Sequence, residues 1–180
     1  MLVLVVGPSG AGKDTLIDGA RAALGGDARF RFVRRVATRP MEPGGEAVSE
    51  KVFFARRDAG GFALHWRANG FHYGIPADIA LDMAAARVVV VNISRALIAE
   101  AAQRFPVRVV EVMAPPDILA RRLAARGRQD AVDMARRLGR SITLRLPVEH
   151  ETIVNDKTVG EGVRSFVAAL NRAASGAPPA

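Results

Sequence analysis

The sequence of 180 residues predicts one α/β domain, in which a parallel sheet is covered by helices on both faces. Short apolar runs rich in valine, such as residues 2–6 and 87–92, alternate with segments that have the apolar spacing of helices. Apolar residues make up 49% of the chain and charged residues 24%, which is typical of a globular protein with one sizeable core. We see no internal repeat that would favour another architecture.

The first predicted strand, residues 2–6, is followed by a glycine-rich loop and then by a helix that stops at Gly25. Glycines let backbone N–H groups converge on a phosphate, and the N-terminus of the helix favours negative charge. A lysine at the end of such a loop can reach the β- and γ-phosphates. We therefore expect the whole loop to bind the phosphates of a nucleotide: Gly7, Pro8, Ser9, Gly10, Ala11, Gly12, Lys13, Asp14 and Thr15.

The residue after Lys13 differs from the usual loop. That position normally carries a serine or threonine that binds Mg²⁺. Here it carries Asp14, and Thr15 follows one place later. The side-chain oxygen of either residue could serve the metal, so the sequence leaves Asp14 and Thr15 as alternative ligands.

Residues 30–75 are rich in aromatic side chains and predict a small β-rich insert that binds the second substrate. We expect a strand at 30–36, a loop at 37–46 and short strands at 52–54 and 62–66. A turn at 58–61 separates the last two, and Asn69-Gly70 predicts a tight hairpin before residues 71–74. The sheet and its helices would then occupy residues 1–29 and 76–175.

Alternation of helices and strands resumes at Pro76. The predicted helices cover residues 76–86, from the Ser94 cap to 104, 115–126, 130–146 and 160–174. The predicted strands cover residues 87–92, 107–113 and 152–155, and the last three residues form a frayed tail. Arginines at helical spacing over residues 121–140 predict a lid, because arginines that close over a transferred phosphoryl group stabilise its charge and exclude water.

Composition restricts the partners and the compartment. The net charge is +8, but of the 26 basic residues only three are lysines and the arginines are dispersed, so we expect an anionic small molecule and no nucleic acid. There is no cysteine, no signal peptide and no apolar run long enough for a membrane span. We expect a soluble cytoplasmic protein without a membrane partner, either a monomer or a homodimer.

The predicted acceptor site has arginines but no evident base. The central strand ends in Asn92, where a carboxylate would be the natural metal ligand or base. No His/Asp pair that could activate a hydroxyl is apparent. A phosphate acceptor needs no base, because its oxygen is largely ionised near neutral pH. The sequence therefore favours transfer to a phosphate over transfer to a sugar hydroxyl.

Several motifs resemble the guanylate kinase superfamily over nearly the full chain. They are Gly-Pro-Ser-Gly-Ala-Gly-Lys at 7–13, Ala-Thr-Arg-Pro at 37–40, Val-Phe-Phe at 52–54, Tyr-Gly-Ile-Pro at 73–76, Arg-Gly-Arg at 126–128 and Val-Asn-Asp at 154–156. The chain departs from true guanylate kinases where they hold GMP. The departures are Glu42 for an arginine, Val52 for a tyrosine, His65 for the guanine-binding glutamate and Asn92 for an acid. A pocket without these carboxylates lacks partners for the N–H groups of guanine.

With these departures, the chain resembles the ribose 1,5-bisphosphate phosphokinases of phosphonate degradation. Similar motifs are Gly-Lys-Asp in the loop, Arg-Arg-Val-Ala-Thr-Arg-Pro from residue 34, Leu-His-Trp from residue 64 and Val-Val-Asn-x-Ser-Arg from residue 90. The resemblance implies that the γ-phosphoryl group of ATP moves to the 1-phosphate of ribose 1,5-bisphosphate and forms 5-phosphoribosyl 1-diphosphate, with Mg²⁺ as cofactor.

On this resemblance, catalysis involves Lys13 and three arginines of the lid, Arg126, Arg128 and Arg137. Asn155 lies near the adenine. The acceptor is expected to contact Arg35, Arg39, His65, Arg67, Tyr73, Asn92 and Arg95. The alternatives are a guanylate kinase or other nucleoside-monophosphate kinase with a remodelled pocket, and a guanylate-kinase-like binding module without catalysis.

Overall fold

Five parallel strands form the central sheet. The computed structural model describes residues 1–40, 45–125, 148 and 150–176. The strands are β1 (Leu2–Val6), β2 (Phe30–Phe32), β7 (Val88–Asn92), β8 (Val107–Met113) and β9 (His150–Val154). They are ordered β2-β7-β1-β8-β9, and every pair is parallel. Because β1 is central, the loop that follows it lies at the middle of the carboxyl edge of the sheet.

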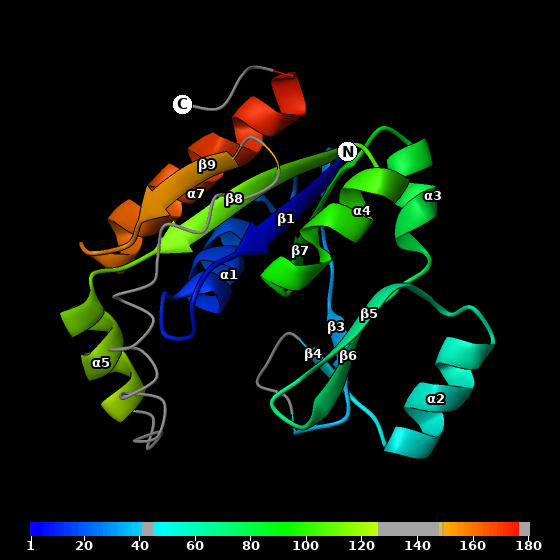
Figure 1. The fold of residues 1–180 in the computed structure, drawn as a ribbon. Helices are drawn as coiled ribbons and strands as arrows, with labels where there is room; N and C mark the ends of the chain where they lie inside the picture. The colour runs from blue at the N-terminus through cyan, green and yellow to red at the C-terminus, as the bar shows by residue number, and fades with distance from the viewer. Residues whose placement is uncertain (41–44, 126–147, 149, 177–180) are drawn as a thin grey trace.

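Helices cover both faces of this sheet, as predicted (Figure 1). One face packs against α1 (Lys13–Leu24), α5 (Pro116–Ala124) and α7 (Val159–Ser175). The other packs against α3 (Ile79–Ala84), the short 3-10 helix η1 (Arg95–Leu97) and α4 (Ile98–Arg104). Along β1, Val3 and Val5 join the first layer, whereas Leu2, Leu4 and Val6 join the second. The apolar run of β1 therefore forms the centre of two cores.

A second sheet lies beside the carboxyl edge of the first. Its strands are β4 (Gly45–Ala47), β3 (Arg35–Ala37), β6 (Phe71–Pro76) and β5 (Phe62–Ala68), in the order β4-β3-β6-β5. The expected hairpin is present between β5 and β6, where Asn69 and Gly70 have φ angles of 50° and 81°. One face of the sheet meets α2 (Glu50–Asp58), and the other contributes Leu64 and Ile75 to the core beneath α3 and α4.

Two predicted strands are wrong in detail. Residues 52–54 lie inside helix α2, which begins after Ser49; the Ser49 hydroxyl accepts a hydrogen bond from the backbone N–H of Val52. The predicted strand over 30–36 is two strands. β2 joins the central sheet and β3 joins the second, and the chain passes between them at Val33 and Arg34.

The predicted loop at 37–46 is also wrong at its end, because Gly45–Ala47 form strand β4, which pairs with β3. The other predicted elements within the described residues are present, with ends no more than three residues from the predicted ones. The predicted helix at 130–146 and the tail at 178–180 lie outside the described residues. In the part of the chain that the structure describes, no helix is both long and apolar enough to cross a membrane.

Candidate active site

The glycine-rich loop connects the end of β1 with the start of α1. Gly7, Gly10 and Gly12 have φ angles of 141°, 86° and 91°, a region that residues with a side chain rarely adopt. At Gly7 a Cβ atom would also lie 2.0 Å from the carbonyl oxygen of Val112 in β8. The loop geometry therefore requires glycine, as the sequence motif predicted.

Lys13 and the start of α1 present positive charge to this loop. The Lys13 Nζ atom donates to the carbonyl oxygens of Gly7 and Pro8, both at 2.8 Å. Gly12 is the N-cap of α1 and has no side chain, so the first N–H groups of the helix are left for another acceptor. An ammonium group and free helical N–H groups around one loop form a site for an anion such as a nucleotide phosphate.

Asn155, predicted near the adenine, is hydrogen-bonded to the backbone of the loop. Its side chain is only 5% exposed, and its Nδ2 atom donates to the carbonyl oxygen of Ala11 at 2.8 Å. Gly12 and Gly162 lie so close to this amide that a Cβ atom on either would fall within 3 Å of it. Asn155 thus joins the end of β9 to the loop and to α7, and its contact with the adenine stays a prediction.

Arg122 is a charged residue at the loop that the predicted catalytic set does not include. Helix α5 packs its Leu119 and Leu123 against Gly10. This packing brings the Arg122 Nη1 atom to 3.4 Å from the carbonyl oxygen of Ala11. The signal in the sequence is the helical spacing of Arg122 and Arg126. Arg126, Arg128 and Arg137 themselves lie outside the described residues.

Asp14 joins three segments that are far apart in the sequence. Its Oδ1 atom accepts a hydrogen bond from Asn92 Nδ2 at 2.7 Å and lies 3.3 Å from Arg35 Nη2. Asn92, predicted to contact the acceptor, is thus at the loop. Thr15 is exposed on the same helix turn. Both alternative metal ligands therefore lie at the start of α1.

The donor set fits Mg²⁺ better than a metal with a full protein cage. Mg²⁺ prefers oxygen ligands and is usually held by one or two protein side chains together with substrate phosphates and water. Within the described ranges, no cluster of three or more His, Cys, Asp or Glu side chains could hold a metal. A single carboxylate beside the phosphate loop, that of Asp14, matches this pattern.

Arg35, Arg39 and Tyr73 lie on the face of the second sheet that is directed toward the loop. Arg35 reaches Asp14, and the Arg39 guanidinium lies 5.7 Å from the centre of the Tyr73 ring. Tyr73 stacks on Trp66, with their ring centres 5.3 Å apart. The Arg39 Nε atom is buried and has no partner within the described residues. This face offers cationic and aromatic groups to a second substrate.

His65 and Arg67 are not brought together with those residues. They alternate with Leu64 and Trp66 along β5, so they lie on the opposite face of the strand. Arg67 pairs with His72, whose ring contacts Phe53 and Phe54 of α2. The side chains of His65 and Arg67 are exposed on the α2 side of the sheet. Their contact with the acceptor stays a prediction, and the geometry favours it less than a contact with Arg35 or Arg39.

Arg95 lies at the carboxyl edge of the central sheet and pairs with a residue that the sequence analysis missed. Its Nη2 atom is 2.8 Å from Oε1 of Glu111, a buried carboxylate on β8. His150 on β9 lies 3.6 Å from the other oxygen of Glu111. The signal in the sequence is an acidic residue inside a valine-rich strand. Because Glu111 neutralises Arg95, this arginine is less available to an acceptor phosphate than Arg39.

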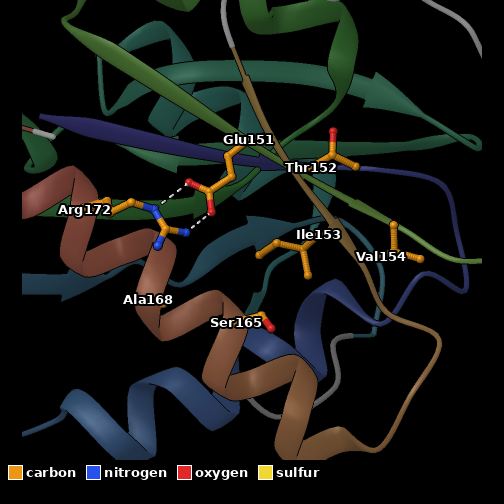
Figure 2. A pocket seen from close by; sticks show the side chains of 7 residues that line it. All are labelled: Glu151, Thr152, Ile153, Val154, Ser165, Ala168 and Arg172. Atoms are coloured by element: carbon orange, nitrogen blue, oxygen red, sulfur yellow. Dashed lines mark hydrogen bonds and ion pairs between the residues drawn. The ribbon is translucent and has the colours of Figure 1, made fainter. Parts of the chain in front are cut away.

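A separate pocket of about 330 Å³ lies between β9 and α7 (Figure 2). Glu151 and Arg172 form a hydrogen-bonded ion pair in its wall, and the hydrogen bond to Glu151 raises the pKa of the Arg172 guanidinium. Thr152, Val154 and Ser165 line the rest of the opening. None of the residues predicted for the active site lines this pocket, and we assign it to the packing of α7 on the edge strand.

The fold and the site define the class of protein: a phosphotransferase of the P-loop kinase type, with a second sheet that faces the phosphate loop. A solved guanylate kinase from Anaplasma phagocytophilum has the same fold, with a TM-score of 0.64, 16% identity, and coverage of 96% of this chain and 85% of that chain. No protein-family model matches the chain.

Curated relatives identify the family. A ribose 1,5-bisphosphate phosphokinase of Acidiphilium cryptum is 50% identical over 162 residues, which cover 89% of this chain and 86% of that protein. One of Methylobacterium radiotolerans is 47% identical over 176 residues, 94% of this chain and 96% of that protein. The chain belongs to the ribose 1,5-bisphosphate phosphokinase family.

Some relatives are longer. A bifunctional ribose 1,5-bisphosphokinase-thymidine phosphorylase of Azorhizobium caulinodans is 48% identical over 177 residues. The match covers 94% of this chain but only 25% of that protein. The chain thus spans about a quarter of this bifunctional relative and most of the length of the other two.

Proposed function

We propose that the protein transfers the γ-phosphoryl group of ATP to the 1-phosphate of ribose 1,5-bisphosphate. An oxygen of the 1-phosphate bonds to the γ-phosphorus, the bond from that phosphorus to the β-phosphate oxygen breaks, and ADP leaves. The product is 5-phosphoribosyl 1-diphosphate. The names of the relatives support this substrate, and we place the reaction in phosphonate catabolism because of the family resemblance.

The observation that carries the proposal is that the expected acceptor site has cationic side chains but no carboxylate that could act as a base. On the loop-facing side of the second sheet, the described residues include Arg35, Arg39 and Tyr73 but no carboxylate. The strand end that could carry an acid has Asn92. A sugar hydroxyl would need a base to accept its proton, whereas a phosphate oxygen is already largely ionised at neutral pH.

The described residues divide the work between the two substrates. The N–H groups of the loop and Lys13 bind the phosphates of ATP, and Arg122 stabilises negative charge from the side of α5. Arg39 and Tyr73 orient the acceptor. Mg²⁺, when bound beside Asp14 or Thr15, neutralises charge on the β- and γ-phosphates.

The test is ADP formation with Mg²⁺–ATP and one of three acceptors: ribose 1,5-bisphosphate, ribose 5-phosphate or GMP. We expect turnover with the bisphosphate alone, and its product should give the two coupled ³¹P resonances of a diphosphate. Lys13→Ala should abolish turnover. Lys51→Ala is the matched control, because Lys51 is exposed on α2 and should leave turnover within twofold of the wild type.

Two results would contradict the proposal. Turnover with GMP alone would make the protein a guanylate kinase with a remodelled pocket. Binding of ATP without turnover of any acceptor would favour a binding module without catalysis.

A further inference from the structure

The contact between Asp14 and Asn92 joins the two places where enzymes with this loop usually bind their metal. Asp14 is the second residue of α1, directly after the loop lysine. Asn92 ends β7 and is paired with Val5 of β1, one strand position before the loop region. In most such enzymes the first place carries a hydroxyl and the second a carboxylate, and the two together hold Mg²⁺. In this chain the carboxylate is on the helix and a neutral group is on the strand.

We propose that Asp14 and Asn92 are an exchanged pair: Asp14 supplies the carboxylate for Mg²⁺, and Asn92 is a positioning residue that fixes its orientation. The inference rests on the proposed use of Mg²⁺–ATP, but not on the identity of the acceptor. It replaces the expected acceptor contact of Asn92 with a role toward Asp14.

The hydrogen bonds support this division of roles. Asn92 and Arg35 both donate to Oδ1 of Asp14, at 2.7 Å and 3.3 Å. Among the described residues none donates to Oδ2, so this oxygen is available to a cation. Asn92 is only 7% exposed, whereas the Asp14 side chain is 56% exposed. A buried amide therefore holds one oxygen of a carboxylate whose other oxygen is accessible beside the phosphate loop.

The chemistry of the two side chains explains why they change together. Two carboxylates at 2.7 Å would repel each other, and one of them would have to bind a proton in the absence of metal. An amide avoids this repulsion and donates an N–H group to the carboxylate. Once a carboxylate stands on the helix, the strand residue at this distance is best neutral, and the pair keeps one negative charge.

The first experiment measures the dissociation constant of ATP without any acceptor, once in excess EDTA and once in excess Mg²⁺. The value in EDTA divided by the value in Mg²⁺ gives the gain in affinity due to the metal, and this ratio is compared between the wild type and each variant. Asp14→Asn should reduce this ratio at least tenfold while the affinity in EDTA stays the same or rises. Asp18→Asn is the matched control, because Asp18 is one turn further along α1, is 51% exposed and forms a surface ion pair with Arg21. It should keep the wild-type ratio. Asn92→Ala should also reduce the ratio about tenfold, as loss of a group that orients a metal ligand typically does.

The second experiment exchanges the two groups. In Asp14→Thr alone, Mg²⁺ should no longer increase the affinity for ATP, because the site is left without a carboxylate. Asp14→Thr combined with Asn92→Asp should recover most of the effect, because the carboxylate is then on the strand. Circular dichroism and thermal unfolding of every variant show whether it is folded.

The outcomes separate this inference from the proposed function. A wild-type ratio in Asp14→Asn, with loss of the ratio in Thr15→Val, would assign the metal to Thr15 and overturn the inference while ATP binding remains. No recovery in a folded double variant would overturn the exchange. A wild-type protein that binds no ATP at all would overturn the proposed function, and the inference with it.

Discussion

Gly7 is the residue at which the geometry of the phosphate loop is most restricted. Because its φ is 141° and a Cβ atom would meet the Val112 carbonyl at 2.0 Å, Gly7→Ala must distort either the loop or β8. We expect this change to lower the free energy of unfolding by more than about 2 kcal/mol, as measured by denaturant unfolding. Gly26→Ala is the control: no atom lies within 4 Å of its Cβ position, and it should stay within about 0.5 kcal/mol of the wild type. Equal effects would mean that the loop tolerates a side chain.

Arg122 and Arg121 provide a second comparison at single residues. Arg122 lies at the loop, whereas Arg121 is 74% exposed and forms a surface ion pair with Asp117. We expect Arg122→Ala to lower kcat/KM for ATP at least tenfold, because it removes a positive charge beside the transferred group. Arg121→Ala should change it less than twofold. Similar losses in both variants, measured by steady-state kinetics, would contradict a specific role for Arg122.

At the residue scale, the sequence was informative where the chemistry lies in one segment. The spacing of the glycines and Lys13 predicted the loop, which the structure forms with the backbone angles that only glycine favours. The contact of Asp14 with Asn92 could not be predicted in the same way, because 78 residues separate the two. Glu111 was missed because an acidic residue within an apolar strand does not by itself reveal its partners.

The N-terminus of α7 allows a prediction for a whole element. Thr158 and Glu161 form a capping box, in which each side chain bonds the backbone N–H of the other residue. Thr158→Ala should destabilise the protein by about 1 kcal/mol, because it leaves an N–H group of the first turn without an acceptor. Denaturant unfolding measures this change.

The same cap predicts a pH dependence. The hydrogen bonds from Thr158 lower the pKa of the Glu161 carboxyl below its ordinary value of 4.5. A lowered pKa means that the stabilisation is complete above 4.5 and is lost as the pH falls through the pKa of the folded state. Glu161→Gln should therefore be less stable than the wild type at pH 7, and the difference should shrink on acidification. Glu50→Gln is the control: Glu50 also lies in the first turn of a helix, but the cap of α2 is the bond from the Val52 N–H group to Ser49 and includes no carboxylate. A pH-independent difference in Glu161→Gln would contradict the role of the charge.

At the scale of elements, periodicity predicted long segments well and short ones poorly. The valine-rich strands β1, β7 and β8 are where the sequence placed them. The Val-Phe-Phe run at 52–54 misled the prediction, because three apolar residues fit a strand and a helix equally well. The flanking residues were the better signal: Ser49 at the cap and basic residues in the last turn, Arg56 and Arg57. The strand at 30–36 was divided because its two halves pair with different sheets, which no local pattern reveals.

At the scale of the molecule, the loop connects β1, α1, α5 and Asn155, so a nucleotide bound there should stabilise the whole fold. With Mg²⁺–ATP at about 100 times its dissociation constant, the free energy of unfolding should rise by about 2.7 kcal/mol. For a chain of this size, this corresponds to an increase in Tm of roughly 5–11 °C. Thermal unfolding of Lys13→Ala should show little of this shift, and Lys51→Ala should show all of it. A full shift in Lys13→Ala would place the nucleotide elsewhere.

The architecture as a whole was predictable, because alternating strands and helices allow few arrangements: a parallel sheet with helices on both faces is the simplest one. The position of the second sheet relative to the first was less predictable. Composition indicated an aromatic insert, but only the structure shows that Arg35, Arg39 and Tyr73 face the loop while His65 and Arg67 face away.

The central position of β1 has a consequence for how the protein is made. β1 precedes every other strand of its sheet in the chain, yet its partners are β7 and β8: Leu2 pairs with Val89 on one side and with Val107 on the other. While the ribosome synthesises the intervening residues, α1 can pack on one face of β1, but the five apolar residues of β1 have no native strand partner. Strand pairing over such sequence separations is slow, and exposed apolar strands aggregate. The nascent chain should therefore depend on chaperones until about residue 113 has emerged, which is the end of β8.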